Sequence, residues 1–516
     1  MAEVQETLSV NPNEPQRTPK TAFGKWLDHY FGISKYGSTI IRELVGGLII
    51  FLAMFYILPV NANMLTGWSS ITSVTTSNVK VLADGTRQIL LWGDVWAPVA
   101  AVYAGVFAAT AVSAAVTTLI MGFFGKLPVG LASGMGINSM IAYTVMLGMG
   151  YNFAQCMALV FMDGLIFLII SVTPLRSWIV RSIPHSLKIA ISAGIGFFIA
   201  FIGLQDMKII VPSSSTAVAL GDFKDPYVLL GLAGLILVLA LSSLPKNNKA
   251  TRWISRFSVI ISLLVMGVVS ASCGVAGVNS AYTLPTFYDS SYSISSLGAF
   301  GDVWGACFHG FDVLAKPEAY ALIFALFFID FFDTTGTLLG VEEGAGMVNK
   351  RGEITVNDQR AMITDAFGTL VGSVCGTTSV TSFVESTTGV AAGARTGLAA
   401  VVTGLLFALS LAIYPALGMF SASCVTGLAL VYVGVCMFAN LSKLEWKDWI
   451  AVGSGFITCL FMLVTYSISD GIAWGFISYT VMTLAAKRFH KSDIPVTAVG
   501  AAFLVLYIVE FATGIK

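Results

Sequence analysis

Apolar runs long enough to cross a lipid bilayer recur along this 516-residue chain, and they constrain its fold more than any other feature. A transmembrane helix needs about 20 mostly apolar residues. The chain is 56 % hydrophobic and 11 % charged, whereas a soluble domain carries about a quarter charged residues. The pattern predicts an all-α polytopic membrane protein with long spans at 41–62, 98–124, 150–173, 184–204, 226–244, 255–277, 320–341, 395–417, 423–440, 448–466 and 469–487.

Three weaker stretches lie between these runs and are rich in Gly, Ser and Thr: 127–146, 359–376 and 377–394. Interrupted segments are tolerated at membrane depth only where protein buries the backbone or where it lines a cavity. With these stretches the count is 14 transmembrane segments. A last apolar run at 496–513 leaves a fifteenth segment open.

The basic residues set the expected orientation, because Lys and Arg favour the cytoplasmic side. They cluster between spans that face inward if the N-terminus is cytoplasmic, whereas the long polar loops 63–97 and 278–319 then lie outside. Residues 1–40 are polar and are expected to form a disordered cytoplasmic tail. The protein is therefore expected in a cell membrane, plasma or inner.

The predicted segments also fall into two similar sets of seven. Seven segments in 41–277 precede the loop 278–319, and seven follow it in 320–487, before a C-terminal segment at 488–516. A repeat with an odd number of spans inserts its second copy upside down, which predicts a 7+7 inverted repeat. Corresponding interrupted segments in the two halves are the best pointers to a transport site.

Composition argues against several other functions. The formal net charge is zero, so no basic surface is available for nucleic acid. The cysteines show no metal-ligand spacing, and neither a metal site, a cofactor nor an enzymatic residue set is expected. Cys273 and Cys307 flank one loop and could form a disulfide, but two unlinked thiols are the favoured interpretation.

The motif FFIDFFDTTGT at 327–337 places Asp330 and Asp333 one helical turn apart in an apolar span. Ionisable groups there are costly and normally face a cavity or a partner, and the spacing puts both on one face. The alternative is that one of them only caps or bridges helices. Both are candidates for proton coupling.

The motif VTSFVESTTGVAAGARTG at 380–397 has an extended opening, then Glu385, then a helix start. Such a start aims free N–H groups and its positive dipole end at a ligand. Glu385 could instead be only an N-cap. The stretch 127–143 has the same design around Ser133 and Gly134, although close helix packing explains such glycines equally well.

Asn61 follows Pro59 in the first span and could donate to a ligand or hold the broken helix; the structural role is slightly favoured. Asp163 and Asp365 are further acids in apolar runs. Without a neighbouring broken helix, they are expected to be packing or relay groups outside the site.

Four motifs together resemble one family: FFIDFFDTTGT, TSFVESTTGVAAGARTG, GLASGMGINSMIAYTV and IPHSLKIAISAGIGFFIAFIGLQ. They are similar to the adenine/guanine/hypoxanthine permease branch of the nucleobase–cation symporter-2, or nucleobase–ascorbate transporter, family, over about residues 40 to 487. The resemblance implies core and gate domains, a homodimer through the gate, and two short antiparallel strands in spans 3 and 10 between which a purine base lies.

The resemblance also implies the binding residues. The span-8 acid falls on Asp330 and the span-10 acid on Glu385. In many relatives with pyrimidine or xanthine substrates the span-8 acid is Glu followed by His, whereas here Phe331 follows an Asp, as in the purine branch. The substrate-binding set is Asp330, Glu385, Phe383, Val384, Ser133, Gly134, Met135, Phe331, Asn61 and Thr334.

The expected function is import of purine nucleobases by symport with a cation, with H⁺ favoured because no Na⁺ cage is evident. An anion transporter of the same fold, for sulfate or bicarbonate, is the alternative. It is disfavoured because two acids at the site would repel an anion unless they were protonated.

Overall fold

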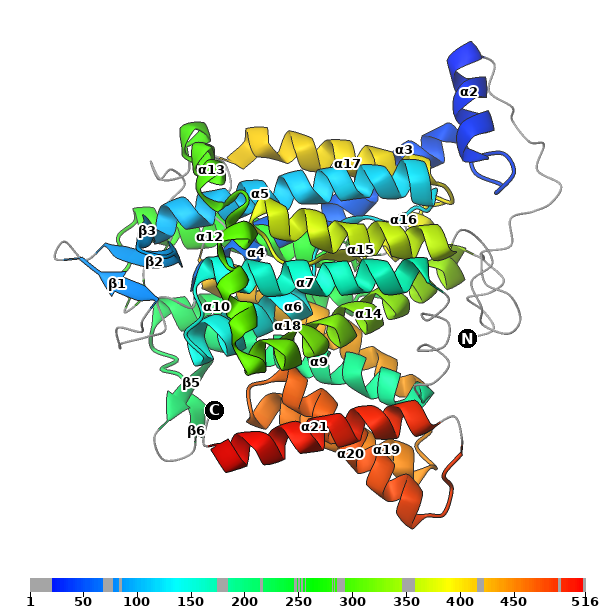
Figure 1. Cartoon of the computed structure of the whole chain (residues 1–516). Coiled ribbons are helices and arrows are strands. Elements are labelled where there is room, and N and C mark those ends of the chain that lie inside the picture. The colour runs from blue at the N-terminus through cyan, green and yellow to red at the C-terminus, as the bar shows by residue number, and fades with distance from the viewer. Residues whose placement is uncertain are drawn as a thin grey trace.

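Figure 1 shows a computed structural model of the chain, an elongated bundle of roughly parallel and antiparallel helices. The structure describes residues 21–67, 78–82, 86–173, 184–213, 217–245, 248, 251, 254–255, 257–280, 282, 284, 293–345, 358–414, 422–490 and 493–513.

In the first half, capping residues define several helix starts. Thr39, Asn152 and Asp225 each accept a backbone N–H bond at the start of a helix, which satisfies donors that the helix leaves unpaired. The membrane segments are α3 (Ile40–Met54) with α4 (Ile57–Gly67), α5 (Val99–Ile120), β4 (Leu131–Ser133) with α6 (Met135–Ser139), α7 (Phe153–Val172), α9 (His185–Asp206), α10 (Pro226–Ser242) and α12 (Ser258–Val275).

The second half repeats this order, including its interrupted third segment. Thr396, Asp448 and Ser467 cap helix starts here. The segments are α14 (Pro317–Ala345), α15 (Asp358–Cys375), β7 (Val380–Ser382) with α16 (Ser386–Ala391), α17 (Gly397–Ser410), α18 (Ser423–Phe438), α19 (Trp449–Val464) and α20 (Ile468–Ala485). A final helix, α21 (Ile494–Thr513), packs against α20.

Among the described residues, seven helices are long and apolar enough to cross a membrane, and α10 and α19 are shorter apolar helices. The two interrupted segments fall at corresponding places of the two halves, as predicted. The 7+7 inverted-repeat fold is confirmed, and the protein is a multi-pass membrane protein.

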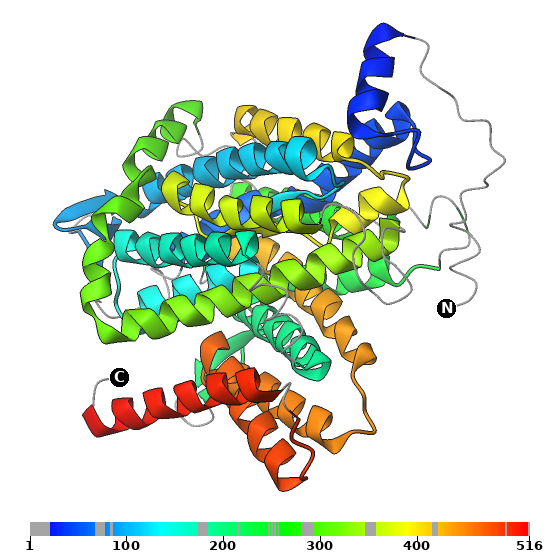
Figure 2. The same cartoon turned by 45° about the vertical axis from the view of Figure 1, so that its right-hand side comes forward.

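The helices pack in two groups. α7 packs on α15, and α17 packs on both α3 and α5; this set, completed by α4, α14 and the two interrupted segments, is called the site group below. α9 packs on α18 and α19, α19 packs on α20, and α10 packs on α12 and α18; this set is called the second group. Figure 2 shows α19 and α20 to one side of the main stack of helices.

Small residues allow the closest approach within the second group. A Cβ atom on Gly427 of α18 would lie 2.7 Å from the carbonyl oxygen of Gly203 on α9, and one on Gly434 would lie 2.4 Å from the carbonyl oxygen of Gly196. Real Cβ atoms do not approach so closely. The α9–α18 crossing therefore depends on glycine at these positions, as in other membrane helix pairs.

One buried acid joins two helices of the site group. Glu43 of α3 accepts N–H bonds from Arg395 (2.8 Å) and Thr396 (3.2 Å), just before α17 begins. A carboxylate at a helix start also interacts favourably with the helix dipole. This contact fixes α3 against α17 close to the end of the second interrupted segment.

The connections hold strands that the sequence did not predict. β1 (Val79–Val81), β2 (Arg87–Trp92) and β3 (Val95–Pro98) form an antiparallel sheet in the loop 63–97, and β5 (Ile210–Ser213) pairs with β6 (Ala217–Leu220). In Figure 1 both sheets lie at the left end of the bundle, opposite α2. Cys273 and Cys307 are free thiols, as favoured from the sequence.

The expectation of a disordered tail over 1–40 is wrong for part of that range. Residues 22–31 form helix α2 (Ala22–Phe31), which Thr21 caps and Gly32 ends in a left-handed conformation. The helix docks through Tyr30, whose ring contacts Phe123 and lies 4.4 Å from the Lys126 ammonium. Residues 1–20 lie outside the described part of the chain.

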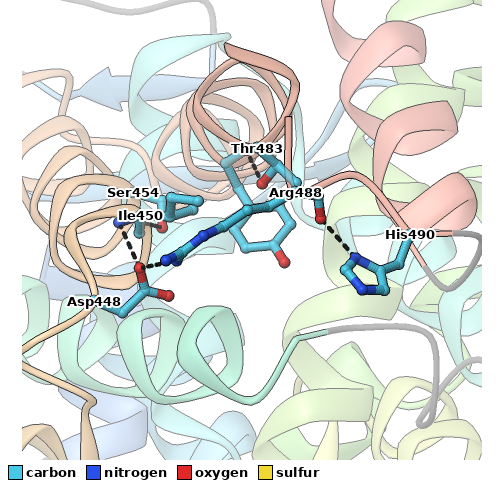
Figure 3. Close-up of polar contacts among 7 residues, drawn as sticks. Asp448, Ile450, Ser454, Thr483, Arg488 and His490 are labelled. Carbon is cyan, nitrogen blue, oxygen red and sulfur yellow. Dashed lines mark hydrogen bonds and ion pairs between the residues drawn. The ribbon is translucent and has the colours of Figure 1, made fainter. Parts of the chain in front are cut away.

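Figure 3 shows polar contacts at one end of α19 and α20. Asp448 accepts from the Ile450 N–H and forms a 3.2 Å ion pair with Arg488, while the His490 ring contacts the Arg488 carbonyl oxygen. A surface groove at this end is lined by residues 445–450 and by Arg488. None of the residues predicted to bind substrate lines this groove.

The glycine crossing generates a stability prediction. Gly427→Ala should lower the free energy of unfolding by about 1–3 kcal/mol, because the new Cβ overpacks the α9 backbone. The measurement is the thermal melting of purified protein in detergent. Gly301→Ala is the matched control, since a Cβ there meets nothing within 4 Å; equal melting of the two variants would contradict the packing argument.

Candidate functional site

A two-stranded ribbon joins the interrupted segments of the two halves. β4 pairs antiparallel with β7, with Leu131 opposite Ser382 and Ser133 opposite Val380. Two more main-chain bonds extend it, from Gly134 N–H to the Ser379 carbonyl (2.8 Å) and from Phe383 N–H to the Gly130 carbonyl (3.0 Å). The predicted strands in spans 3 and 10 are confirmed, and their pairing satisfies backbone groups that no helix can satisfy there.

A helix starts directly after each strand, α6 at Met135 and α16 at Ser386. Because the strands are antiparallel, these helices leave from opposite ends of the ribbon. The N–H groups of Gly134 and Phe383 belong to the ribbon and are not available to a ligand. The N–H group of Val384 makes no main-chain hydrogen bond among the described residues, so it is the one that could donate to a ligand.

Glu385 lies at the ribbon's α16 end. It occupies the N-cap position of α16, but its side chain makes no capping bond. Instead, the Tyr56 hydroxyl of the first span donates to Glu385 Oε1 at 2.6 Å. Glu385 is half-buried and the adjacent Val384 is 38 % exposed. The carboxylate is thus held by Tyr56 and still reachable, which the N-cap interpretation does not explain.

Asp330 of α14 is fully buried beside the ribbon. Its Oδ2 atom accepts from Thr369 Oγ1 of α15 (2.7 Å) and from Ser379 Oγ next to β7 (2.9 Å), whereas Oδ1 has no hydrogen-bond partner among the described residues. Two hydroxyl groups therefore orient the carboxyl group, and one oxygen remains unused. Asp333, one turn further along α14, is only half-buried.

Asp365 of α15 corrects one sequence interpretation, because it does have a broken helix as its neighbour. Its Oδ1 atom accepts from both the backbone N–H and the hydroxyl of Ser382, each at 2.6 Å, and its Oδ2 atom accepts from Thr334. Asp365 therefore holds the end of β7 against α14. Thr334 was predicted to bind substrate, but its hydroxyl group donates a hydrogen bond to Asp365.

A buried network of small polar side chains fixes the start of β7. Asn61 Nδ2 donates to Thr110 (2.7 Å) and Thr377 (2.8 Å), and Ser133 Oγ contacts Thr378 (2.8 Å). These bonds join the first, second, third and tenth segments. The geometry agrees with the slightly favoured structural role of Asn61; direct binding by Asn61 or Ser133 stays a prediction.

The aromatic and apolar members of the predicted set are almost entirely covered. Phe331 is fully buried and packs edge-on against Phe167 of α7, with a ring separation of 6.0 Å. Phe383 is 7 % exposed and Met135 5 % exposed. Their contact with a ligand stays a prediction, and Phe331 in this conformation belongs to the α7–α14 packing.

Sequence reasoning missed the hydroxyl groups that position the acids, namely those of Tyr56, Thr369 and Ser379. One signal was available, because the weak stretch 359–376 places Asp365 and Thr369 one turn apart on a single helix face. The acids interact electrostatically, Asp330 with Asp365 and Asp333, and Asp333 with Glu385. The described residues contain no cluster of His, Cys, Asp and Glu that could hold a metal ion.

The inverted repeat and its paired broken helices define a membrane transporter. The solved transmembrane domain of the cyanobacterial bicarbonate transporter BicA has this fold, with a TM-score of 0.56 at 12 % identity, over 84 % of this chain and 96 % of that one.

Residues 90–474 match the model of the Permease family. Adenine permease AdeQ of Escherichia coli (strain K12) is 32 % identical over 477 residues, covering 92 % of this chain and 95 % of that protein. Guanine/hypoxanthine permease PbuG of Bacillus subtilis (strain 168) is 34 % identical over 468 residues, covering 90 % and 96 %. The chain belongs to this permease family, the nucleobase–cation symporters, and is a transporter, not an enzyme.

The Asp365 contacts generate a prediction about the ribbon. Asp365→Ala leaves the donors at Ser382 and Thr334 unsatisfied, which should cost about 1–3 kcal/mol in the free energy of unfolding and speed hydrogen exchange at residues 380–382. Asp365→Asn keeps an acceptor for Ser382 and should be milder. Hydrogen-exchange mass spectrometry in detergent measures this, with exposed Asp302→Ala as control; unchanged exchange in Asp365→Ala would contradict the assigned role.

Proposed function

We propose that the protein imports purine nucleobases into the cell by symport with protons. The observation that carries the proposal is the placement of a buried Asp330 and a reachable Glu385 at the two ends of β7, in a permease whose relatives include adenine and guanine/hypoxanthine permeases.

The chemistry of a purine suits this arrangement. A purine is flat and neutral, with N–H groups and ring nitrogens along its edges, so it needs hydrogen-bond partners in its plane and apolar faces above and below. Glu385 accepts from an N–H edge, and the N–H group of Val384 donates to a ring nitrogen. In this proposal the unpaired Oδ1 of Asp330 accepts a further N–H of the base. Phe383 and Met135 cover the faces of the base.

The anion-transporter alternative has less support. The likeness to the bicarbonate transporter at 12 % identity concerns the fold alone. A site that holds both Glu385 and Asp330 repels an anion unless both acids are protonated. Uptake of labelled adenine and guanine, with sulfate and bicarbonate as controls, in cells that lack their own purine permeases tests the choice; anion uptake without purine uptake would reverse it.

We place the protein in the plasma or inner membrane with a cytoplasmic N-terminus, on the bias of Lys and Arg toward one set of connections. We also propose a homodimer through the second group, which includes α9, α18 and α19. The resemblance to the symporter family supports the dimer, and a native mass in nanodiscs equal to two chains is the expected result.

Binding through Glu385 is tested by two substitutions. Glu385→Gln turns an acceptor-only group into one that also donates, and should weaken purine binding between about five-fold and over a hundred-fold, equivalent to ~1–3 kcal/mol. Tyr56→Phe removes one hydrogen bond to Glu385 and should weaken binding about five-fold. Calorimetry on folded protein in detergent measures both, with exposed Glu445→Gln as control. Full affinity in Glu385→Gln would remove Glu385 from the site.

Proton coupling is tested with proteoliposomes under an imposed inward proton gradient. One proton that crosses with each purine contributes ~2.3 kcal/mol per 100 mV, so wild-type protein should concentrate purine up to about 50-fold per 100 mV, and a protonophore should abolish this. Asp330→Asn should abolish accumulation, whereas Asp333→Asn should be milder because Asp333 is only half-buried. Accumulation driven by Na⁺ alone would reject proton symport.

A further inference from the structure

A third buried acid faces the site from α7. Asp163 is fully buried, and neither of its carboxyl oxygens has a hydrogen-bond partner among the described residues. An unpaired polar group in an apolar interior is costly, and a charged one far more so. Ionisable residues inside membrane spans are therefore taken as candidates for a functional role.

Packing places the turn of α7 that carries Asp163 against the residues around Asp330. The adjacent Gly164 lies against Thr369, because a Cβ on Gly164 would be 2.9 Å from Thr369 Cγ2, and Thr369 is the residue that donates to Asp330. One turn further along α7, Phe167 packs on Phe331, next to Asp330. The two carboxyl groups interact electrostatically.

The surroundings supply no counter-charge. Among the described residues, no basic side chain pairs with Asp163, and Asp330 is the charged group that acts on it. Asp365 of α15 and Asp333 of α14 act on Asp330. Asp312 packs near the start of α7 but is bound to Gln155, two turns before Asp163. The charged groups that act on this pair among the described residues are thus acids.

We propose that Asp163 and Asp330 form a proton-binding dyad, in which one carboxyl O–H donates to the unpaired oxygen of the other carboxyl group. One proton then satisfies oxygens on both residues and removes one of two adjacent negative charges, which cannot both be held in an apolar interior. Asp163 is thus the partner that stores the coupling proton, while Asp330 also contacts the ribbon. This inference rests on the proton symport proposed above.

The dyad makes the proton stoichiometry depend on a residue that does not touch the purine. Calorimetry of purine binding in buffers of different ionisation enthalpy reports protons taken up with the substrate. Wild-type protein should take up close to one proton per purine. Asp163→Asn should take up at least five-fold less and lose gradient-driven accumulation, while its purine affinity changes less than three-fold and purine exchange without a gradient continues. Exposed Asp312→Asn, which contacts the same helix, is the matched control.

The outcomes separate the two proposals. Wild-type binding and transport without proton uptake would overturn proton symport, and the dyad with it. Proton uptake that is equal in wild type and Asp163→Asn would overturn the dyad alone. If Asp163→Asn does not fold, Asp163→Glu retains a carboxyl group and should restore proton uptake. Infrared spectra of wild-type protein should show a protonated-carboxyl band that is lost in Asp163→Asn; its absence from the wild type would also overturn the dyad.

Discussion

The whole site depends on the main-chain pairing of β4 with β7. Inside a bilayer each backbone N–H and C=O group needs a partner within the protein. β4 and β7 are not helical, so their backbone groups have no partners within their own segments. They satisfy each other across the two repeats, with Gly134 and Phe383 extending the ladder at both ends. Both interrupted segments can therefore persist at membrane depth only as a pair, and the helix starts that follow are fixed relative to one another.

Hydroxyl groups, not basic side chains, position the acids around this ribbon. Thr369 and Ser379 bind Asp330, Ser382 binds Asp365, and Tyr56 binds Glu385. A hydroxyl group can donate to a carboxylate and can also accept from a protonated carboxyl group. An arginine can donate to a carboxylate but cannot accept from a protonated carboxyl group. It would therefore keep its acid partner ionised. The choice of partner therefore leaves these acids free to change protonation without losing their positions.

The sequence allowed the segments, the doubled organisation and the central acids Asp330 and Glu385 to be predicted, because ionisable groups and broken patterns stand out in apolar runs. It did not reveal their partners. Thr369 and Ser379 lie 39 and 49 residues from Asp330, so only tertiary packing brings them together. Helix α2 was missed because a ten-residue helix is marginal alone and here depends on docking against Phe123.

The hydrogen bonds that hold the three acids of the site are shorter than three side-chain bonds that run between the two groups. The bonds that hold Asp330, Asp365 and Glu385 measure 2.6–2.9 Å. Between the groups, Tyr143 reaches Asp206 at 3.5 Å, Thr144 reaches the Tyr466 carbonyl at 3.3 Å, and Asn63 reaches Thr426 at 3.5 Å. Bonds near that limit are weak. The ribbon and its acids lie entirely within the site group, so a displacement of one group against the other would leave the hydrogen bonds of the acids intact.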